Sequence, residues 1–338
     1  MLLLAALPFL LIAQFNSNKE PLIVKSLANE TIKNVQVKTS GGSIAVSGVS
    51  AGDARIEVYV SPNNNRNNLT KEEIQQRLDD RYDLQISVDN GKLVAIAKSK
   101  SRNNWREALN ISFKVFVTKN VSTDLLTSGG SINLNDLSGD LDFSTSGGSL
   151  NLDNVSGKVD GKTSGGSINV KNSKDDIYLS TSGGSINAKN CDGKLRLNTS
   201  GGSLNLEDLK GEIKAATSGG SVKGNNIDGE LKAHTSGGSI HFTNLSGSVE
   251  TGTSGGRIYV EIKEMGEYVK IKNSSGNIDV VLPKNSGLDI NLSGNVAKTK
   301  FDHFDGRISE HRVDGKLNGG GIPVQVSTSS GTISLSLE

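Results

Sequence analysis

Several residue types are scarce in this sequence, and each shortage excludes a class of protein. Cys191 is the only cysteine among 338 residues, so no disulfide can form within the chain. Basic residues number 37 and acidic residues 36, so the net charge supplies no field that would attract nucleic acid or an anionic membrane. Aromatic residues make up only 4%, which counts against a sugar-binding site built on stacked rings.

All five prolines lie outside residues 63–282, so this long stretch contains none. A long run rich in Gly, Ser and Asn would otherwise suggest disorder. The absence of proline and the regular recurrence of Ile, Leu and Val indicate an ordered structure instead.

The amino terminus is short and apolar. Residues 2–13 carry no polar side chain, which is the length of a signal-peptide core and too short to cross a bilayer. We therefore expect residues 1–15 to be a signal peptide with a shortened basic start, and the protein to be exported to the periplasm, the cell surface or the medium. The alternative is a buried first strand.

The sequence Thr-Ser-Gly-Gly recurs eight times, and every step is 18 residues. The copies begin at Thr127, Thr145, Thr163, Thr181, Thr199, Thr217, Thr235 and Thr253. A diverged copy begins upstream at Thr39, and weaker copies begin downstream at Ser274 and Ser329. Such regularity without an insertion is a specific sign of a repeat architecture.

The composition of the repeat favours strands over helix. Two adjacent glycines would each cost a helix about 1 kcal/mol. When the first Thr is position 1, apolar residues fall at positions 6 and 8 and again at 15 and 17, a spacing typical of half-buried strands. In the first repeat these positions hold Ile132, Leu134, Leu141 and Phe143.

Two turn signals separate the strands of each repeat. Ser-Gly-Gly at positions 2–4 and Asn/Asp-x-x-Gly at positions 10–13 predict corners at which glycine adopts a positive φ. Two strands and two corners make one coil, and identical coils stack because each hydrogen-bonds the next. The sequence thus predicts an all-β protein in which residues 127–260 form a parallel β-solenoid (β-helix) of 18-residue coils.

A solenoid has open strand edges at both ends and needs caps. Residues 22–126 are predicted to form an N-terminal cap of strands and one short helix, at residues 70–82. Thr70 and Glu73 fit a capping box at the start of this helix. Residues 261–338, with irregular spacing, are predicted to continue the solenoid and cap its C-terminal end.

No set of residues has the spacing of a catalytic or metal site. A corner separates His234 from His241, and Asp175 and Asp176 stand beside each other rather than opposed. The recurring Asp of calcium-binding β-rolls is missing, and a strand follows the glycines where a phosphate loop needs a helix. We therefore expect no catalytic residue, no cofactor and no metal, and we expect Cys191 to be a small core residue.

The outward positions of the first strand form two uncharged columns, serine at position 5 and asparagine at position 7. Ten of these residues make a candidate contact ladder: Ser131, Asn133, Ser149, Asn151, Ser167, Asn169, Ser185, Asn187, Ser203 and Asn205. One interpretation is that they hydrogen-bond along the rod and keep it soluble. The other is a flat recognition face for a polymer or another cell surface. The second strand carries mixed charges, which are typical of a solvated face.

The run of Thr-Ser-Gly-Gly-Ser-Ile/Leu-Asn coils resembles the putative-adhesin β-strand-repeat family of bacterial envelope proteins, whose domain has no known function. The resemblance extends to Tyr82-Asp83-Leu84, to residues 109–113 and to the closing Asn-Gly-Gly-Gly at residues 318–321. It implies an exported, β-helical, non-enzymatic protein of the surface or periplasm, typical of Bacteroidota-like bacteria. No catalytic or binding residue of the family can be carried over.

We therefore expect a non-enzymatic, adhesin-like bacterial envelope protein that presents the Ser/Asn ladder to an unidentified surface polymer or protein. The first alternative is a periplasmic binding or scaffolding module in envelope sensing. The second is a carbohydrate-active β-helix enzyme, which would need acidic residues clustered on one face. Nucleic acid is not an expected partner, the mature form is expected to have no membrane span, and the sequence leaves the oligomeric state open.

Overall fold

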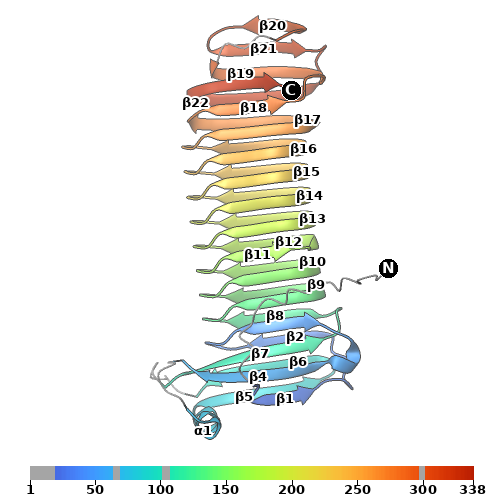
Figure 1. Cartoon of the computed structure of the whole chain (residues 1–338), viewed down its shortest axis with the longest axis vertical. Coiled ribbons are helices and arrows are strands. Elements are labelled where there is room, and N and C mark those ends of the chain that lie inside the picture. The colour runs from blue at the N-terminus through green and yellow to red at the C-terminus, as the bar shows by residue number, and fades with distance from the viewer. Residues whose placement is uncertain (1–19, 64–68, 101–106, 297–300) are drawn as a thin grey trace, which may run out of the picture.

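The computed structural model describes residues 20–63, 69–100, 107–296 and 301–338. In this part of the chain, parallel strands stack into a long rod with the N-terminal elements at one end and the C-terminal elements at the other (Figure 1). Strands make up 69% of the structure, in about 9 coils with one short α-helix. The predicted all-β parallel solenoid is therefore confirmed. The predicted signal peptide, residues 1–15, lies outside the described residues.

Each regular coil is one bent strand rather than the two separate strands that the sequence predicts. The strand turns at the Asn/Asp-x-x-Gly corner while it stays paired with the neighbouring coils on both sides of the bend. The regular coils are β9 (Ile132–Thr145), β10 (Leu150–Thr163), β13 (Ile186–Thr199), β14 (Leu204–Thr217), β15 (Val222–Thr235) and β16 (Ile240–Thr253).

One coil is interrupted at its corner, between β11 (Ile168–Lys171) and β12 (Lys174–Thr181). Ser173 and Asp175 stand there in place of the usual apolar residue and glycine. Ser173 Oγ accepts the backbone N–H of Val155 at 3.2 Å, and Asp175 Oδ2 accepts that of Gly157 at 2.9 Å. Side chains thus replace the missing ladder bonds, and the carboxylate of Asp175 is committed to the backbone.

All regular coils stand in register, which turns equal repeat positions into columns along the rod. Leu150, for example, pairs with Ile132 on one side and with Ile168 on the other. The columns at positions 6, 8, 15 and 17 are buried, as the spacing predicts, and position 11 adds a fifth inward column. Cys191 belongs to that fifth column and is 3% exposed, which confirms it as a core residue.

The Ser-Gly-Gly corner differs from the prediction in what it requires of glycine. No Ser-Gly-Gly glycine of the eight repeats has a positive φ. A Cβ on the second glycine would instead lie 2.0–2.1 Å from the carbonyl oxygen of the same glycine, or its counterpart Gly42, in the preceding coil. At the other corner the prediction is confirmed, because the glycine that closes it has a positive φ of 98–147° in the regular coils. The Asn or Asp that opens this corner also has a positive φ, of 51–56°, and is the type of residue that tolerates the left-handed region best after glycine. The first corner therefore needs glycine for close backbone approach.

The threonine that opens each repeat holds this corner to the coil before it. Its side chain is buried in all eight repeats. Thr145 Oγ1, for example, donates to the carbonyl oxygen of Gly130 at 2.8 Å and accepts the backbone N–H of Gly148 at 3.3 Å. Since both functions of the hydroxyl are satisfied inside the rod, the threonine column is part of the scaffold and offers nothing to solvent.

The N-terminal end combines strands that join the stack with strands that close it. Its elements are β1 (Ile23–Ser26), β2 (Asn34–Lys38), β3 (Ile44–Gly48), a 3₁₀ turn (Ala51–Asp53), β4 (Arg55–Pro62), α1 (Lys71–Arg81), β5 (Tyr82–Asp89), β6 (Lys92–Ser99), β7 (Leu109–Val117) and β8 (Ser122–Thr127). β3 and β8 continue the coils onto β9 in parallel, and β2, β6 and β7 extend them. β4 and β5 then add antiparallel strands, and β1 lies at the edge.

The predicted short helix is present as α1, at the end of the rod (Figure 1). Thr70 is its N-cap, and its side chain accepts the backbone N–H of Glu73 while Glu73 accepts that of Thr70. The capping box is therefore confirmed. Leu78 is the buried residue by which the helix packs on the strands.

The C-terminal end closes the stack with a late strand. The elements are β17 (Ile258–Ser275), β18 (Ile278–Leu282), β19 (Leu288–Val296), β20 (Phe304–Ile308), β21 (Arg312–Leu317) and β22 (Ile322–Leu337). The last strand, β22, runs parallel to β17, β18 and β19 and lies between them. The antiparallel pair β20 and β21 covers the outer edge of β19.

The two glycines of one corner give a matched test of close approach. We expect Gly184→Ala to lower the free energy of unfolding by about 3 kcal/mol, since its Cβ would lie 2.1 Å from the carbonyl oxygen of Gly166. Gly183→Ala should cost less than about 1 kcal/mol, because its nearest neighbour would lie at 3.6 Å. Denaturant unfolding measures both, and equal losses would contradict close approach as the reason for glycine.

Candidate binding surface

The Ser/Asn face is the outer surface of the first half of each coil, formed by the ten predicted ladder residues and the positions beside them. The structure brings the five asparagines together as neighbours on β9, β10, β11, β13 and β14. They stand between buried apolar columns and are half-buried or exposed. Because strands in a ladder are about 4.8 Å apart, the face repeats the same groups at that interval.

The asparagine side chains form a continuous hydrogen-bonded ladder. Asn151 Nδ2 donates to Asn133 Oδ1 at 2.9 Å, and the same contact recurs at each step up to Asn205, at 2.7–2.9 Å. An amide has two donor hydrogens and two acceptor lone pairs. Each inner member of the ladder therefore keeps one donor and one acceptor that the ladder does not use.

Three of the five ladder serines, Ser131, Ser185 and Ser203, accept a backbone N–H of the next coil. Ser131 Oγ accepts the N–H of Ser149 at 3.1 Å, and Ser185 Oγ accepts that of Ser203 at 3.1 Å. The contact provides a hydrogen-bond acceptor for a backbone N–H just before the strand begins, where backbone hydrogen bonds between coils have not yet resumed. The serine column is thus tied to the stack, and the asparagine column supplies most of the free hydrogen-bonding capacity of the face.

The ladder stops at its N-terminal end, where β3 takes the place of a regular coil. Asn133 stands beside Ala45 instead of another asparagine. Its Nδ2 is buried and has no hydrogen-bond partner among the described residues. A hollow of about 760 Å³ opens here along the foot of the ladder. Its lining includes Ala45, Phe116, Asn133, Asn135, Asn151 and Asn169.

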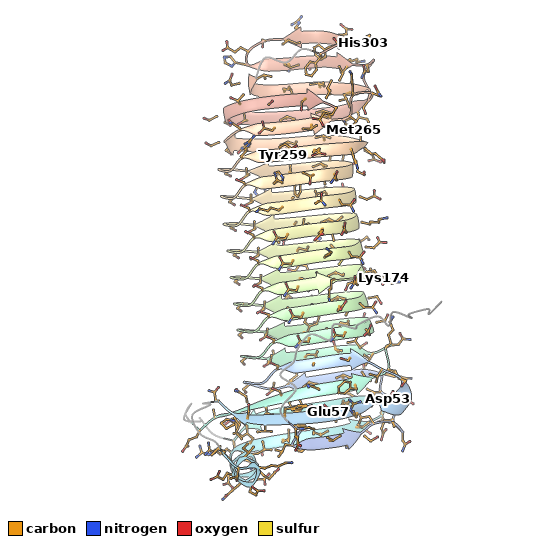
Figure 2. All side chains as sticks on the ribbon, viewed as in Figure 1. Asp53, Glu57, Lys174, Tyr259, Met265 and His303 are labelled. Carbon is orange, nitrogen blue, oxygen red and sulfur yellow. The ribbon has the colours of Figure 1, made fainter. Side chains whose placement is uncertain are left out.

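Aromatic and charged side chains border the hollow on β4 and β7. Arg55 lies over the ring of Phe116 at 3.8 Å, and Lys114 lies over that of Tyr59 at 4.4 Å. Tyr59 in turn donates to Glu57 at 2.7 Å, and Figure 2 shows Glu57 at this end of the rod. The ladder prediction missed these residues, although their alternation with buried residues along both strands was visible in the sequence.

Two pKa shifts in this cluster follow from its contacts. Burial, together with the hydrogen bond to Glu57 and its charge, raises the pKa of Tyr59 to about 12. Burial opposes ionisation of Glu57, but the hydrogen bonds from Tyr59 and Arg55 outweigh it and lower the pKa of the carboxyl group. At neutral pH the cluster therefore presents a fixed carboxylate, a neutral phenol and two cations.

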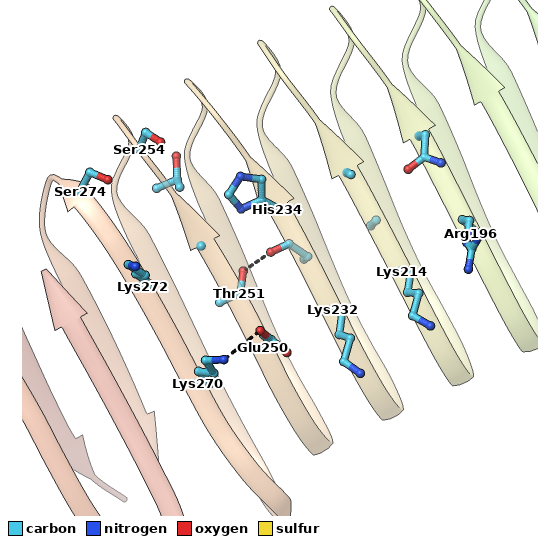
Figure 3. Close-up of a pocket in the computed structure, with 16 residues that line it drawn as sticks. Arg196, Lys214, Lys232, His234, Glu250, Thr251, Ser254, Lys270, Lys272 and Ser274 are labelled. Atoms are coloured by element: carbon cyan, nitrogen blue, oxygen red, sulfur yellow. Dashed lines mark hydrogen bonds and ion pairs between the residues drawn. The ribbon is translucent and has the colours of Figure 1, made fainter.

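A second, shallower depression of about 820 Å³ lies on the other half of the coils. Figure 3 shows Arg196, Lys214 and Lys232 on three successive strands, followed by Glu250 and then by Lys270, which pairs with Glu250 at 3.3 Å. The floor is low because small residues, including Ala216 and Gly252, replace longer side chains there. Charge, rather than amide groups, dominates this surface.

The histidines and aspartates considered in the sequence lie at separate places on the rod. No group of three or more potential metal ligands occurs in the described residues. The ring of His241 stacks on Tyr259 with centroids 4.8 Å apart, and His234 is exposed on the other half of the coil. Asp175 serves the backbone of the interrupted coil. Within the same residues no helix is long and apolar enough to cross a membrane.

Two solved structures align with most of this chain at low similarity. One is described as a putative cell adhesion protein from Clostridium sporogenes ATCC 15579, with 12% identity, 94% of this chain and 98% of that chain covered, and a TM-score of 0.19. The other is described as a putative adhesin from Bacteroides fragilis NCTC 9343, with 11% identity, 93% and 96% covered, and a TM-score of 0.25. These scores are too low to support an argument about function. No curated protein matches the chain.

A family model matches just under half of the chain, toward its C-terminal end. The model is described as Toastrack DUF4097, and the match spans residues 171–336, from the last residue of β11 into β22. The matched segment includes regular coils, the inserted strand β22 and the closing hairpin. The match agrees with the resemblance that the repeats indicated, and residues 171–336 form a region similar to the Toastrack DUF4097 family, a domain of unknown function.

Proposed function

We propose that this protein is an exported, adhesin-like surface protein that binds a glycan polymer along its Ser/Asn face, and that it acts by binding rather than by catalysis. The observation that carries the proposal is the foot of the ladder. There Asn133 Nδ2, which is buried and has no hydrogen-bond partner among the described residues, belongs to a side chain that lines an open hollow. A buried polar group without a hydrogen bond is costly, and a ligand hydroxyl that accepts from Nδ2 would remove that cost.

The groups around the hollow suit a sugar. Side-chain amides can donate to one hydroxyl and accept from the next, as the unused functions of Asn133 and Asn151 would. Phe116 supplies an apolar wall, and the Arg55 guanidinium on that ring adds fixed donors. The shortage of aromatic residues in the whole chain matters less than it first suggests, because Phe116 and Tyr59 lie on adjacent strands beside the ladder.

The ladder above the hollow suits a polymer rather than a single sugar. Its unused donors and acceptors recur at every coil from Asn133 to Asn205, so a chain anchored in the hollow can make further contacts along the rod. Each contact is weak alone, but linked contacts bind with an effective concentration that multiplies their affinities.

The arrangement of carboxylates favours binding over hydrolysis. Asp136 and Asp153 both line the hollow, but they stand on adjacent coils on the same side of it. Glycoside hydrolysis needs two carboxyl groups that flank the scissile bond. The carboxylates here can accept hydrogen bonds from a sugar, whereas their placement offers no opposed acid and base.

Filling the hollow should weaken binding while leaving the rod intact. We expect Ala45→Leu to weaken binding to glycans identified on an array by at least about tenfold, because the larger side chain occupies the space next to Asn133. Lys223→Leu, on the same column but beyond the asparagines, is the matched control. Titration calorimetry measures the affinity and thermal unfolding checks the fold. Undiminished binding by a folded Ala45→Leu protein would place the contact elsewhere.

Interrupting the ladder tests the contribution of the polymer track. The triple change Asn133→Lys, Asn169→Lys and Asn205→Lys should remove array binding, since cations replace amides at three of the five steps. Binding retained by the triple variant would rule out the Ser/Asn face. Whole bacterial or host cells, used as a second target, separate an adhesin from a periplasmic module, because only the adhesin should coat them.

A further inference from the structure

The surface of the second half of the coils, here called the charged face, changes sign along the rod. It consists of the outward residues at positions 14, 16 and 18 and their counterparts on the N-terminal strands. At position 16, seven strands from β8 to β15 carry three acidic residues, then a tyrosine, then three basic residues, before Glu250 on β16: Asp124, Asp142, Asp160, Tyr178, Arg196, Lys214 and Lys232. A column with opposite charges at its two ends can complement a reversed copy of itself.

Six charges in the middle of this face form no ion pair within the described part of the chain. All six side chains are exposed, and they are Asp140, Asp142, Lys158, Asp176, Lys194 and Arg196. Other charges on the face do pair locally, such as Lys162 with Asp160 and Lys232 with Glu230. The six unpaired charges therefore remain available to a partner.

We infer that the charged face docks against the same face of a second copy of this chain, with the two rods antiparallel. The two-fold axis runs across the rods, between β10 and β12. In this register each column faces itself in reverse, and the six unpaired charges become three complementary pairs, each made twice by symmetry. The pairs are Asp140 with Lys194, Asp142 with Arg196, and Lys158 with Asp176. Further out, Asp124 opposes Lys214.

The pattern specifies this register and no neighbouring one. A slip of one coil in one direction sets Asp176 against Asp176 and Lys158 against Lys194. A slip in the other direction sets Lys158 against Lys158 and Asp140 against Asp176. Parallel rods would bring Arg196 against Arg196. Like charges held together at short range destabilise an interface, so electrostatics disfavours both one-coil slips and the parallel arrangement.

The shapes of the two halves also fit in the antiparallel register. Leu126 is one of the few large apolar side chains left in water, with 45% of its surface exposed. In this register it faces Ala216, on the floor of the depression of about 820 Å³. Half-buried Ile96, two strands beyond Leu126, faces Gly252 in the same way. Apolar side chains of the N-terminal half thus meet small residues of the C-terminal half.

The basic half alone fits a polyanion less well. Lys214, Lys232 and Lys270 are each paired with a glutamate on the same surface. Those carboxylates would repel an anionic polymer, and the acidic half of the face would repel the rest of its chain. A second copy satisfies both halves at once. The Ser/Asn faces of both copies then point outward, away from the interface.

Charge reversal and charge exchange test the antiparallel pair. The purified chain should sediment as a dimer at low ionic strength and dissociate as salt is added, because the pairs are screened. Arg196→Asp should shift it to monomer, since the new carboxylate meets Asp142 twice. The double change Asp142→Arg with Arg196→Asp should restore the dimer. Lys223→Asp, an exposed reversal on the Ser/Asn face, should leave it unchanged.

Cross-linking tests the register itself. Ser144 and Asn198 oppose each other across the proposed interface, and the native Cys191 is buried. A mixture of Ser144→Cys and Asn198→Cys proteins should form a covalent dimer on oxidation, whereas Ser144→Cys alone should not, because its own copy lies about 14 Å away. A chain that is monomeric at every salt concentration overturns the inference. So does a monomer that binds dextran sulfate through Arg196, or a Ser144→Cys protein that cross-links to itself.

Discussion

The structure depends on how closely two coils approach at the Ser-Gly-Gly corner. The second glycine of one corner lies against the carbonyl of its counterpart below, in a space that admits no Cβ. The buried threonine then joins the same two backbones through its hydroxyl. Because this contact repeats in all eight Thr-Ser-Gly-Gly repeats, it fixes the register of the whole stack, and both surfaces inherit that register as straight columns of side chains.

The sequence was sufficient to predict the features that repeat. The period of 18 residues, the spacing of two between apolar residues and the capping box of Thr70 and Glu73 all act locally, and each is confirmed. The reason given for glycine was wrong at one corner, because close approach between coils is a contact between distant residues. The sequence also failed to predict that each coil is one continuous bent strand. The cause is the same, since backbone pairing with the neighbouring coils keeps the corner hydrogen-bonded.

The hollow could not be predicted, because it arises where the repeat fails. Ala45 belongs to β3, which stands 88 residues before Asn133 in sequence and beside it in space. Phe116 and Lys114 lie beside the hollow because β7 pairs with β3, and no local sequence pattern predicts that pairing. The same holds for β22, whose position between earlier strands is set by the whole C-terminal end. The ladder was visible in the sequence, whereas its termination and the groups around it were not.

The Ser/Asn face and the charged face differ in how much they vary from coil to coil, although the same stack of coils forms both. A column of identical asparagines looks the same after a shift of one coil, so it can bind a repeating polymer but cannot select one alignment. The charged column varies from coil to coil, and a shift of one coil changes attraction into repulsion. A face that binds a repeating polymer benefits from identical residues in every coil, because the polymer can then bind in every register. A face that must recognise another copy of the rod gains from variation, because only variation distinguishes the correct register from its neighbours.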